Sequence, residues 1–175
     1  MMDFLELAKN RYSERHFDGT RPVEEEKLSQ ILEAGRIAPT ACNYQPQRVY
    51  VLESEEALNT AARMTRTFDA PTVLLVCYDM DTVWTNPHDQ RYENFNSGEQ
   101  DASIVAASMM FEAEDLGIHS IWLRGFDSKT VSEGFDLPDT IVPVMMLAIG
   151  YPAEHSKPAH LHATRKDLSK TVVRL

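Results

Sequence analysis

The sequence predicts an α+β domain in which helices pack against a sheet with apolar central strands. Residues 102–116 are apolar on nearly every side, which indicates a helix buried against several neighbours. Residues 72–78 and 142–149 are continuous apolar runs of strand length, which is typical of strands covered on both faces. At 175 residues the chain can bury such a core as one domain, residues 1–175.

The N-terminal part begins with a predicted helix at residues 4–10, followed by a basic segment at residues 11–17. Arg11, Ser13 and Arg15 alternate in this segment, and alternate side chains of an extended chain point the same way. Two guanidinium groups and a hydroxyl suit a phosphate, because each planar guanidinium pairs with two oxygens. A solvated basic turn shows the same pattern, so the segment alone leaves both interpretations open.

A second helix is predicted from Pro22 to Ile37, with proline and acidic residues in its first turn and apolar residues at helical spacing. Residues 38–46 follow as a loop, because a proline near each end prevents regular structure. The loop supplies hydroxyl and amide groups without charge, a mixture that suits a flat heterocycle with polar edges. An ordinary connection between a helix and a strand fits the same residues.

The middle of the chain is predicted as a strand at residues 48–52, a helix at residues 55–64 and the apolar strand. Residues 79–100 show the least pattern, and they contain the aromatic residues Trp84 and Tyr92. A long connection with aromatic residues is often the lid or wall of a substrate site, although a surface loop fits as well.

The buried helix is the centre of the predicted fold. Asp101 is its predicted N-cap, and Gly117 is expected to take the left-handed conformation that ends it. A strand at residues 118–123 follows, and the turn at residues 124–127 is where we expect a ligand. The small side chains of the helix allow close backbone approach, so we expect it to pack across a dimer axis. The residues expected at that axis are Ala106, Ala107, Met109, Met110 and Ala113.

The last part is predicted to contain a helix at residues 128–135 and the second apolar strand. Three histidines follow in the tail, but no carboxylate or cysteine pattern completes a ligand set, so no metal site is predicted. Residues 171–175 are strand-like, and they are expected to extend the sheet of this chain or of a partner. The three histidines are His155, His160 and His162.

The overall composition excludes several classes of partner. A net charge of −10 argues against nucleic acid or an anionic membrane as the main partner, but not against a small anion held by a few arginines. Cys42 and Cys77 make no disulfide framework and are expected to be reduced thiols. The N-terminus has neither a basic region nor a long apolar run, so no signal peptide is expected. We therefore expect a cytoplasmic protein.

Four stretches in order resemble the FMN-dependent nitroreductase family: residues 11–17, residues 38–46, residues 117–127, and Gly150–Tyr151–Pro152 with the later pair Arg165–Lys166. The resemblance covers essentially the whole chain. It implies a nitroreductase-like three-layer sandwich with a mixed, mostly antiparallel sheet flanked by helices. It also implies a homodimer built on the long central helix, with the C-terminal strand exchanged between subunits.

The resemblance also implies the cofactor site. Arg11, Ser13 and Arg15 would hold the phosphate and ribityl chain of FMN, with Arg165 or Lys166 closing on the phosphate. The loop at residues 39–45 would contact the isoalloxazine of the other subunit, and residues 123–125 would line its opposite edge. The side chain facing flavin N1 and the C2 carbonyl stays unassigned, with Arg66 as a candidate. The expected cofactor-binding residues are Arg11, Tyr12, Ser13, Arg15, Pro39, Thr40, Ala41, Asn43, Gln45, Leu123, Arg124, Gly125, Arg165 and Lys166.

The activity implied by the resemblance is transfer of two electrons from NAD(P)H through FMN to an electron-poor acceptor such as a nitroaromatic or a quinone. No catalytic side chain is predicted, because the flavin carries the chemistry. No G-x-G-x-x-G motif is present, so a Rossmann-type nucleotide site is not expected. Two alternatives remain open: another flavin reaction on the same scaffold (dehalogenation, ene reduction or flavin breakdown), and a flavin-binding protein without turnover. Gln47 stands where family members often carry Trp, which affects local packing.

Overall fold

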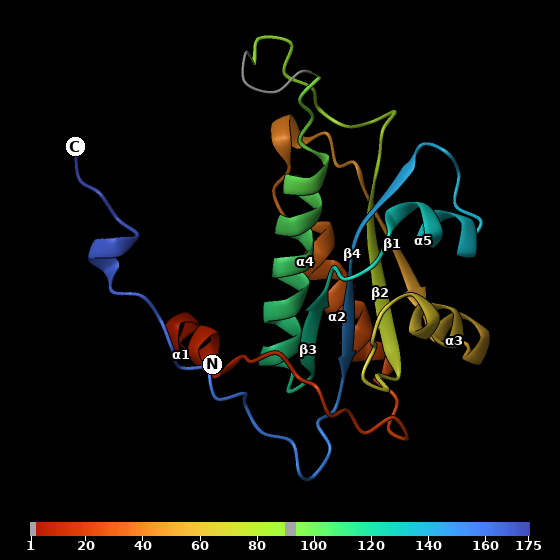
Figure 1. The fold of residues 1–175 in the computed structure, drawn as a ribbon, viewed down its shortest axis with the longest axis vertical. Coiled ribbons are helices and arrows are strands. Elements are labelled where there is room, and N and C mark those ends of the chain that lie inside the picture. The colour runs from red at the N-terminus through yellow and green to blue at the C-terminus, as the bar shows by residue number, and fades with distance from the viewer. Residues whose placement is uncertain (1–2, 90–93) are drawn as a thin grey trace.

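The computed structural model describes residues 3–89 and 94–175. Nearly every helix and strand predicted from the sequence in this part is present, with boundaries shifted by a few residues. The elements are α1 (Phe4–Asn10), α2 (Glu25–Arg36), β1 (Gln47–Leu52), α3 (Glu55–Met64), β2 (Thr72–Asp79), α4 (Gly98–Asp115), β3 (His119–Leu123), α5 (Ser128–Gly134) and β4 (Ile141–Gly150) (Figure 1). Two short 3-10 turns, η1 (Ala41–Asn43) and η2 (Leu168–Lys170), complete the set.

The four strands form one sheet in the order β1-β2-β4-β3, and every neighbouring pair is antiparallel. The sheet of the described chain is therefore antiparallel rather than mixed. The one parallel pairing in the described residues is an isolated bridge between Ser13 and Ser120, beside the edge strand β3. The N-terminal segment thus lies along this edge without forming a fifth strand.

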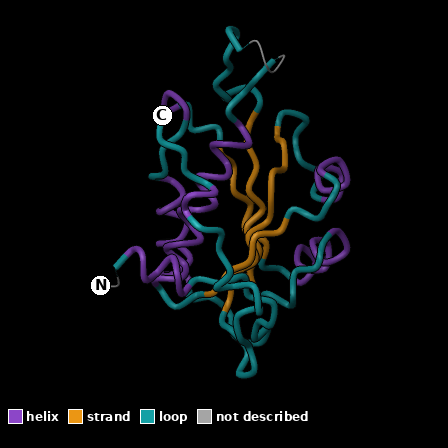
Figure 2. Tube along the Cα trace, turned by 60° about the vertical axis from the view of Figure 1, so that its left-hand side comes forward, coloured by secondary structure: helices purple, strands orange, loops and turns teal. Residues whose placement is uncertain are grey.

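Helices cover both faces of the sheet, which makes three layers (Figure 2). Along β2, Leu74 and Val76 pack toward α2 and α4, whereas Val73 and Leu75 belong to a second core on the side of α3 and α5. Successive side chains of a strand point to opposite faces, so a strand covered twice needs apolar residues at every position. This requirement explains the continuous apolar run of β2.

The central helix α4 packs on its own chain more closely than the sequence suggested. Ala106, Met109 and Ala113 are fully buried between the sheet and α2, so they cannot form a surface for a partner. At the crossing with α2, a Cβ on Gly35 would lie 2.8 Å from Met109 Cγ, so the two helices approach to contact. The side that faces outward carries Ile104, whose exposed fraction is 42%, and Phe111, whose ring centroid is 5.2 Å from that of Phe4 in α1.

The sequence predicted the residues at which α4 begins and ends. The N-cap prediction for Asp101 is wrong, because the helix starts earlier with Ser97 as its N-cap, and Asp101 is buried in the first turn. The stop at Gly117 is confirmed, with a φ of +73°. Gly117 N–H donates to Glu114 O and Ile118 N–H donates to Ala113 O, the hydrogen-bond pair of a Schellman motif.

The C-terminal tail leaves the sheet after Tyr151 and runs past α1 (Figure 1). Residues 171–175 form no strand within this chain and are exposed, Val173 by 80%. The expected strand therefore does not extend the chain's own sheet. No helix in the described part of the chain is long and apolar enough to cross a membrane.

Candidate functional site

Residues 11–17 run beside β3 and then beside the end of β4. Glu14 N–H donates to Ser120 O at 3.0 Å, and His16 O accepts from Ala153 N–H at 2.7 Å. Both contacts involve main-chain atoms, so the path of the segment does not depend on its surface side chains. The pairing keeps the segment extended, which is the condition under which Arg11, Ser13 and Arg15 point the same way.

The extended path sorts the side chains of this segment into two sets. Tyr12 and Glu14 are buried, while Arg11, Ser13 and Arg15 line a surface hollow of about 190 Å³. The other wall of the hollow comes from the C-terminal tail. We call it the basic hollow, and its lining comprises Arg11, Ser13, Arg15, Leu161, His162 and Arg165, together with Tyr12 and Ala159.

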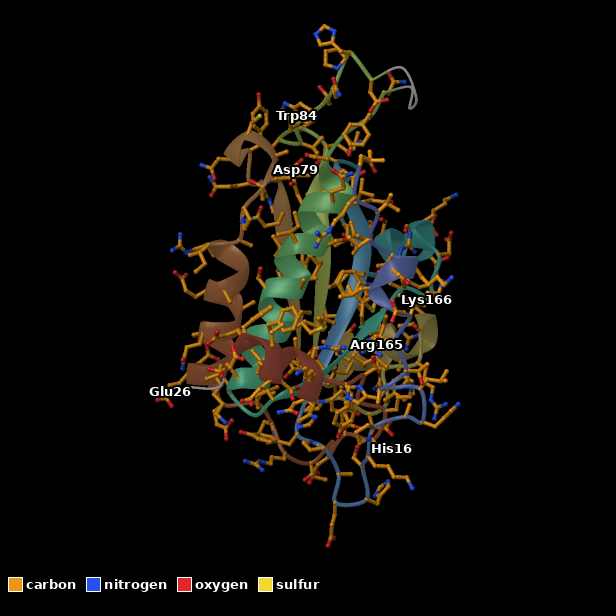
Figure 3. All side chains as sticks on the ribbon, turned by 90° about the vertical axis from the view of Figure 1, so that its left-hand side faces the viewer. His16, Glu26, Asp79, Trp84, Arg165 and Lys166 are labelled. Atoms are coloured by element: carbon orange, nitrogen blue, oxygen red, sulfur yellow. The ribbon has the colours of Figure 1, made fainter. Side chains whose placement is uncertain are left out.

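The tail supplies one of its two basic residues to the basic hollow. Arg165 lines it, whereas Lys166 does not, although the two are neighbours on the tail (Figure 3). The Arg165 guanidinium donates to the backbone oxygens of His162 and Thr164, and His162 Nε2 lies 2.9 Å from the backbone oxygen of Lys9. Three guanidinium groups and one hydroxyl thus gather from two ends of the sequence, which is a donor set suited to a phosphate.

A second hollow, of about 350 Å³, shares Arg15 with the first. It also contains Arg66, whose guanidinium carbon lies 4.7 Å from the centre of the Phe68 ring. We call it the Arg66 hollow. Arg66 lies in the loop between α3 and β2, where no sequence pattern marks a site, so sequence reasoning had no signal that assigned it. Because Arg15 lines both hollows, we call the two together the basic tract.

The turn after β3 passes near the loop between α3 and β2. A Cβ on Gly125 would come within 3.9 Å of Thr65 Oγ1, and Thr65 precedes Arg66 in the chain. Leu123 is buried, while Arg124 is exposed and donates from Nη1 to Phe126 O at 3.2 Å. The turn thus approaches the loop that carries Arg66, although none of residues 123–125 lines either hollow.

The polar loop at residues 39–45 lies elsewhere. Asp101, near the start of α4, accepts a hydrogen bond from Ala41 N–H at 2.8 Å and another from Ser97 Oγ at 2.6 Å. The basic segment lies instead beyond the other end of α4, where Ser13 pairs with Ser120. Asp101 and Asp115, the last residue of α4, are 14 residues apart, so the part of the helix between the two regions is about 21 Å long (Figure 1). One chain does not bring the two predicted groups of cofactor-binding residues together.

Within the loop, the predicted residues are accessible to varying degrees. Pro39, Asn43 and Gln45 are exposed, and Thr40 and Ala41 are partly covered. Gln45 N–H donates to Thr40 Oγ1 at 3.1 Å, and the backbone φ angles of Asn43 and Gln45 are +58° and +52°. The loop is held in this shape by its own hydrogen bonds, since the Gln45 side-chain amide also donates to Asn43 O at 3.3 Å.

Replacement of Asp101 by alanine is expected to lower the free energy of unfolding by about 1–3 kcal/mol. The change leaves the Ala41 N–H and the Ser97 hydroxyl without their acceptor in a largely buried position. Chemical denaturation measures the loss. Asp115→Ala removes the same charge from an exposed position at the other end of α4 and should change stability by less than about 0.5 kcal/mol. Equal effects of the two changes would contradict a tethering role for Asp101.

The long connection before α4 lies at the same end of the molecule as the polar loop, because Asp79 N–H donates to Pro46 O at 2.9 Å. Trp84 and Asp79 lie at the end opposite His16 (Figure 3). Residues 90–93, including Tyr92, lie outside the described residues, so the expectation that this connection forms a wall of the site stays a prediction. Among the residues that are described, no three histidine, cysteine or acidic side chains gather in a way that could hold a metal ion.

Comparison with known proteins identifies the relatives of the chain. The sequence profile of the Nitroreductase family matches residues 8–67 and 58–151. A solved nitroreductase family protein from Clostridium difficile 630 is 40% identical, with a TM-score of 0.90 and 98% of each chain covered. A protein of Exiguobacterium sibiricum solved in complex with FMN is 25% identical, with a TM-score of 0.82, covering 100% of this chain and 98% of that one. A Thermus thermophilus protein named NADH dehydrogenase is 27% identical, covering 91% of this chain and 92% of its own length.

Proposed function

Because the chain belongs to the nitroreductase family, we propose that it is an FMN-dependent oxidoreductase. In this proposal two electrons pass from NAD(P)H through bound FMN to an electron-poor acceptor such as a nitroaromatic or a quinone. The names of two relatives support the cofactor and the electron donor, since one was solved with FMN and another is called NADH dehydrogenase.

The basic hollow is the observation that carries the proposal. Its three guanidinium groups and the Ser13 hydroxyl match the charge and the acceptor oxygens of the FMN phosphate. A local cluster of this kind stands out in a chain with a net charge of −10. The donor set therefore fits the phosphate end of the cofactor.

The Arg66 hollow and the turn after β3 would hold the isoalloxazine part of FMN. Arg66 would face N1 and the C2 carbonyl of the isoalloxazine, and its positive charge would favour electron density at that edge. Residues 123–125 would line the opposite edge, where Leu123 is covered and Gly125 has no side chain of its own. FMN, when bound, supplies the hydride and electron transfer chemistry, and these residues bind and orient it.

We further propose that the working unit is a homodimer with shared sites. The polar loop at residues 39–45 is separated from the basic hollow of its own chain by about 21 Å of α4, too far for both to contact one isoalloxazine. A second copy, packed on the outward side of α4, would bring its loop to the first copy's flavin. Residues 171–175, which pair with no strand of their own chain, would be free to extend the partner's sheet.

A visible spectrum of the purified protein tests the proposed function. We expect flavin absorption and its loss when NADPH or NADH is added without oxygen, followed by recovery when a quinone is added. A coloured protein that neither nucleotide bleaches would be a passive flavin binder. A protein that stays colourless after incubation with FMN and gel filtration would contradict the proposal.

A further inference from the structure

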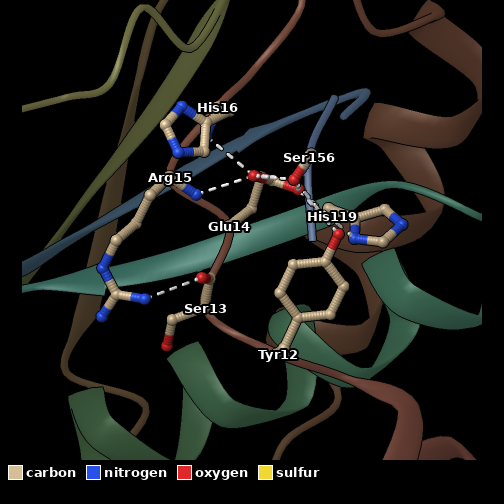
Figure 4. A network of polar contacts seen from close by, with 7 residues as sticks. All are labelled: Tyr12, Ser13, Glu14, Arg15, His16, His119 and Ser156. Atoms are coloured by element: carbon tan, nitrogen blue, oxygen red, sulfur yellow. Dashed lines mark hydrogen bonds and ion pairs between the residues drawn. The ribbon is translucent and has the colours of Figure 1, made fainter. Parts of the chain in front are cut away.

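Glu14 is a buried carboxylate in the middle of the basic segment, with no exposed surface. Its Oε1 atom accepts hydrogen bonds from the backbone N–H groups of Arg15 and His16, each at 2.7 Å (Figure 4). Tyr12 Oη donates to Oε2 at 2.9 Å, and Ser156 Oγ lies 2.6 and 2.7 Å from the two carboxylate oxygens. In Figure 4 the amides of Arg15 and His16 lie on one side of the carboxylate, and Ser156 and Tyr12 lie on the other.

The groups that donate hydrogen bonds to the carboxylate are all neutral. His119 is a basic side chain beside it, and its Nδ1 lies 3.9 Å from Oε2 without a hydrogen-bond partner among the described residues. Burial by itself raises the pKa of Glu14, but the hydrogen bonds from Ser156, His16, Tyr12 and Arg15 outweigh it and hold the pKa below its ordinary value. The donors therefore hold Glu14 in its charged form at neutral pH.

The four donors join two parts of the chain that are remote in sequence. Two of them are the main-chain N–H groups of Arg15 and His16 in the basic segment. Their hydrogen bonds to Glu14 fix the backbone at Arg15, whose side chain lines the hollow. Ser156 begins the stretch of the tail that carries His162 and Arg165 to the opposite wall. The described tail touches the segment through few other polar contacts, notably Ala153 N–H to His16 O.

We propose that Glu14 and Ser156 are positioning residues of the basic hollow, which fix its two walls at the spacing that a phosphate monoester needs. Neither side chain lines the hollow, so neither would touch the phosphate. The inference rests on the proposed function, because it takes the phosphate to be that of FMN. It assigns these two residues to selection of FMN over riboflavin, the same flavin without the phosphate.

The test compares the affinities of the apo-protein for FMN and for riboflavin by fluorescence titration. Ser156→Ala should weaken FMN binding by about tenfold and riboflavin binding by less than about twofold. The hydrogen bond that it removes positions only the tail side of the basic hollow, where the phosphate would bind. Ser156→Thr keeps a hydroxyl and should restore most of the FMN affinity. Ser54→Ala removes the N-cap hydroxyl of α3, away from the basic hollow, and should leave the preference for FMN unchanged.

Glu14→Gln is a second test of the same hydrogen-bond network, since it keeps the size of the side chain and removes its charge. A folded Glu14→Gln protein, checked by its circular dichroism and melting curve, should show the same selective loss of FMN affinity. If Ser156→Ala keeps the wild-type preference, or loses FMN and riboflavin affinity alike, the inference is wrong while the proposed function stands. Wild-type protein that binds neither flavin would overturn the proposed function and this inference together.

Discussion

Ile104→Glu is expected to convert the protein into a monomer that does not retain FMN. Ile104 is 42% exposed on the outward side of α4, and Ala107 and Phe111 follow it at positions i+3 and i+7 along the same side. Phe4 and Leu5 of α1, with exposed fractions of 60% and 62%, add to the apolar surface of the described chain. In the proposed dimer a carboxylate at this position would be buried without a partner, at a cost of several kcal/mol.

The reason for a joint loss is the shared site. If the polar loop of one copy covers the flavin held by the basic tract of the other, dissociation removes the contacts that the loop makes with each cofactor. Obligate interfaces of this kind usually bury more than about 2,000 Å² and resemble a core cut in two. A single charge in the middle of such a surface therefore affects assembly and cofactor content together.

Sedimentation velocity and visible absorbance on the same sample measure both properties. Asn59→Glu places the same charge on the exposed side of α3, across the sheet from α4, and should leave a flavin-containing dimer. The outcome that would refute the shared site is a monomeric Ile104→Glu protein with full FMN occupancy. A dimer with full occupancy would instead remove the outward side of α4 from the interface.

Arg11→Ala and Arg15→Ala are each expected to weaken FMN binding by roughly tenfold to a hundredfold. Each change removes a charge-assisted hydrogen bond, worth about 1.5–3 kcal/mol, from the proposed phosphate site. Arg15 is exposed and Arg11 is partly exposed, so neither belongs to the apolar cores and both variants should fold. Arg15→Ala should have the larger effect, because Arg15 lines both hollows.

Calorimetric titration of the apo-protein with FMN measures these affinities. Lys129→Ala removes the same unit of charge from an exposed position on α5, and it separates a local contact from a change in net charge. FMN affinity should be unchanged in this variant. Wild-type affinity in both arginine variants would exclude the basic hollow as the phosphate site.

The sequence by itself determined most of the secondary structure, because the relevant signals are local. The apolar run of β2 reflects its cover on both faces, and Gly117 ends α4 since its φ of +73° is a conformation that residues with a Cβ rarely adopt. The alternation of Arg11, Ser13 and Arg15 also survives in the structure, because main-chain pairing beside Ser120 keeps that segment extended. Each of these features can be recognised from residues within a few positions of one another, although the helices that cover β2 and the pairing partner Ser120 are distant in sequence.

The tertiary structure decided which of these residues act together. Arg165 joins Arg11 in one hollow and Arg66 lies in the next, although no local pattern links the three. It also corrected the role of Asp101 from helix cap to buried tether of the polar loop. The apolar pattern of a helix predicts that the helix is covered, but it does not identify what covers it. For this reason Ala106 of α4 was expected to contact a partner subunit, whereas the sheet and α2 of the same chain bury it. Such contacts join residues that are far apart in the sequence, so they cannot be predicted from a short stretch of it.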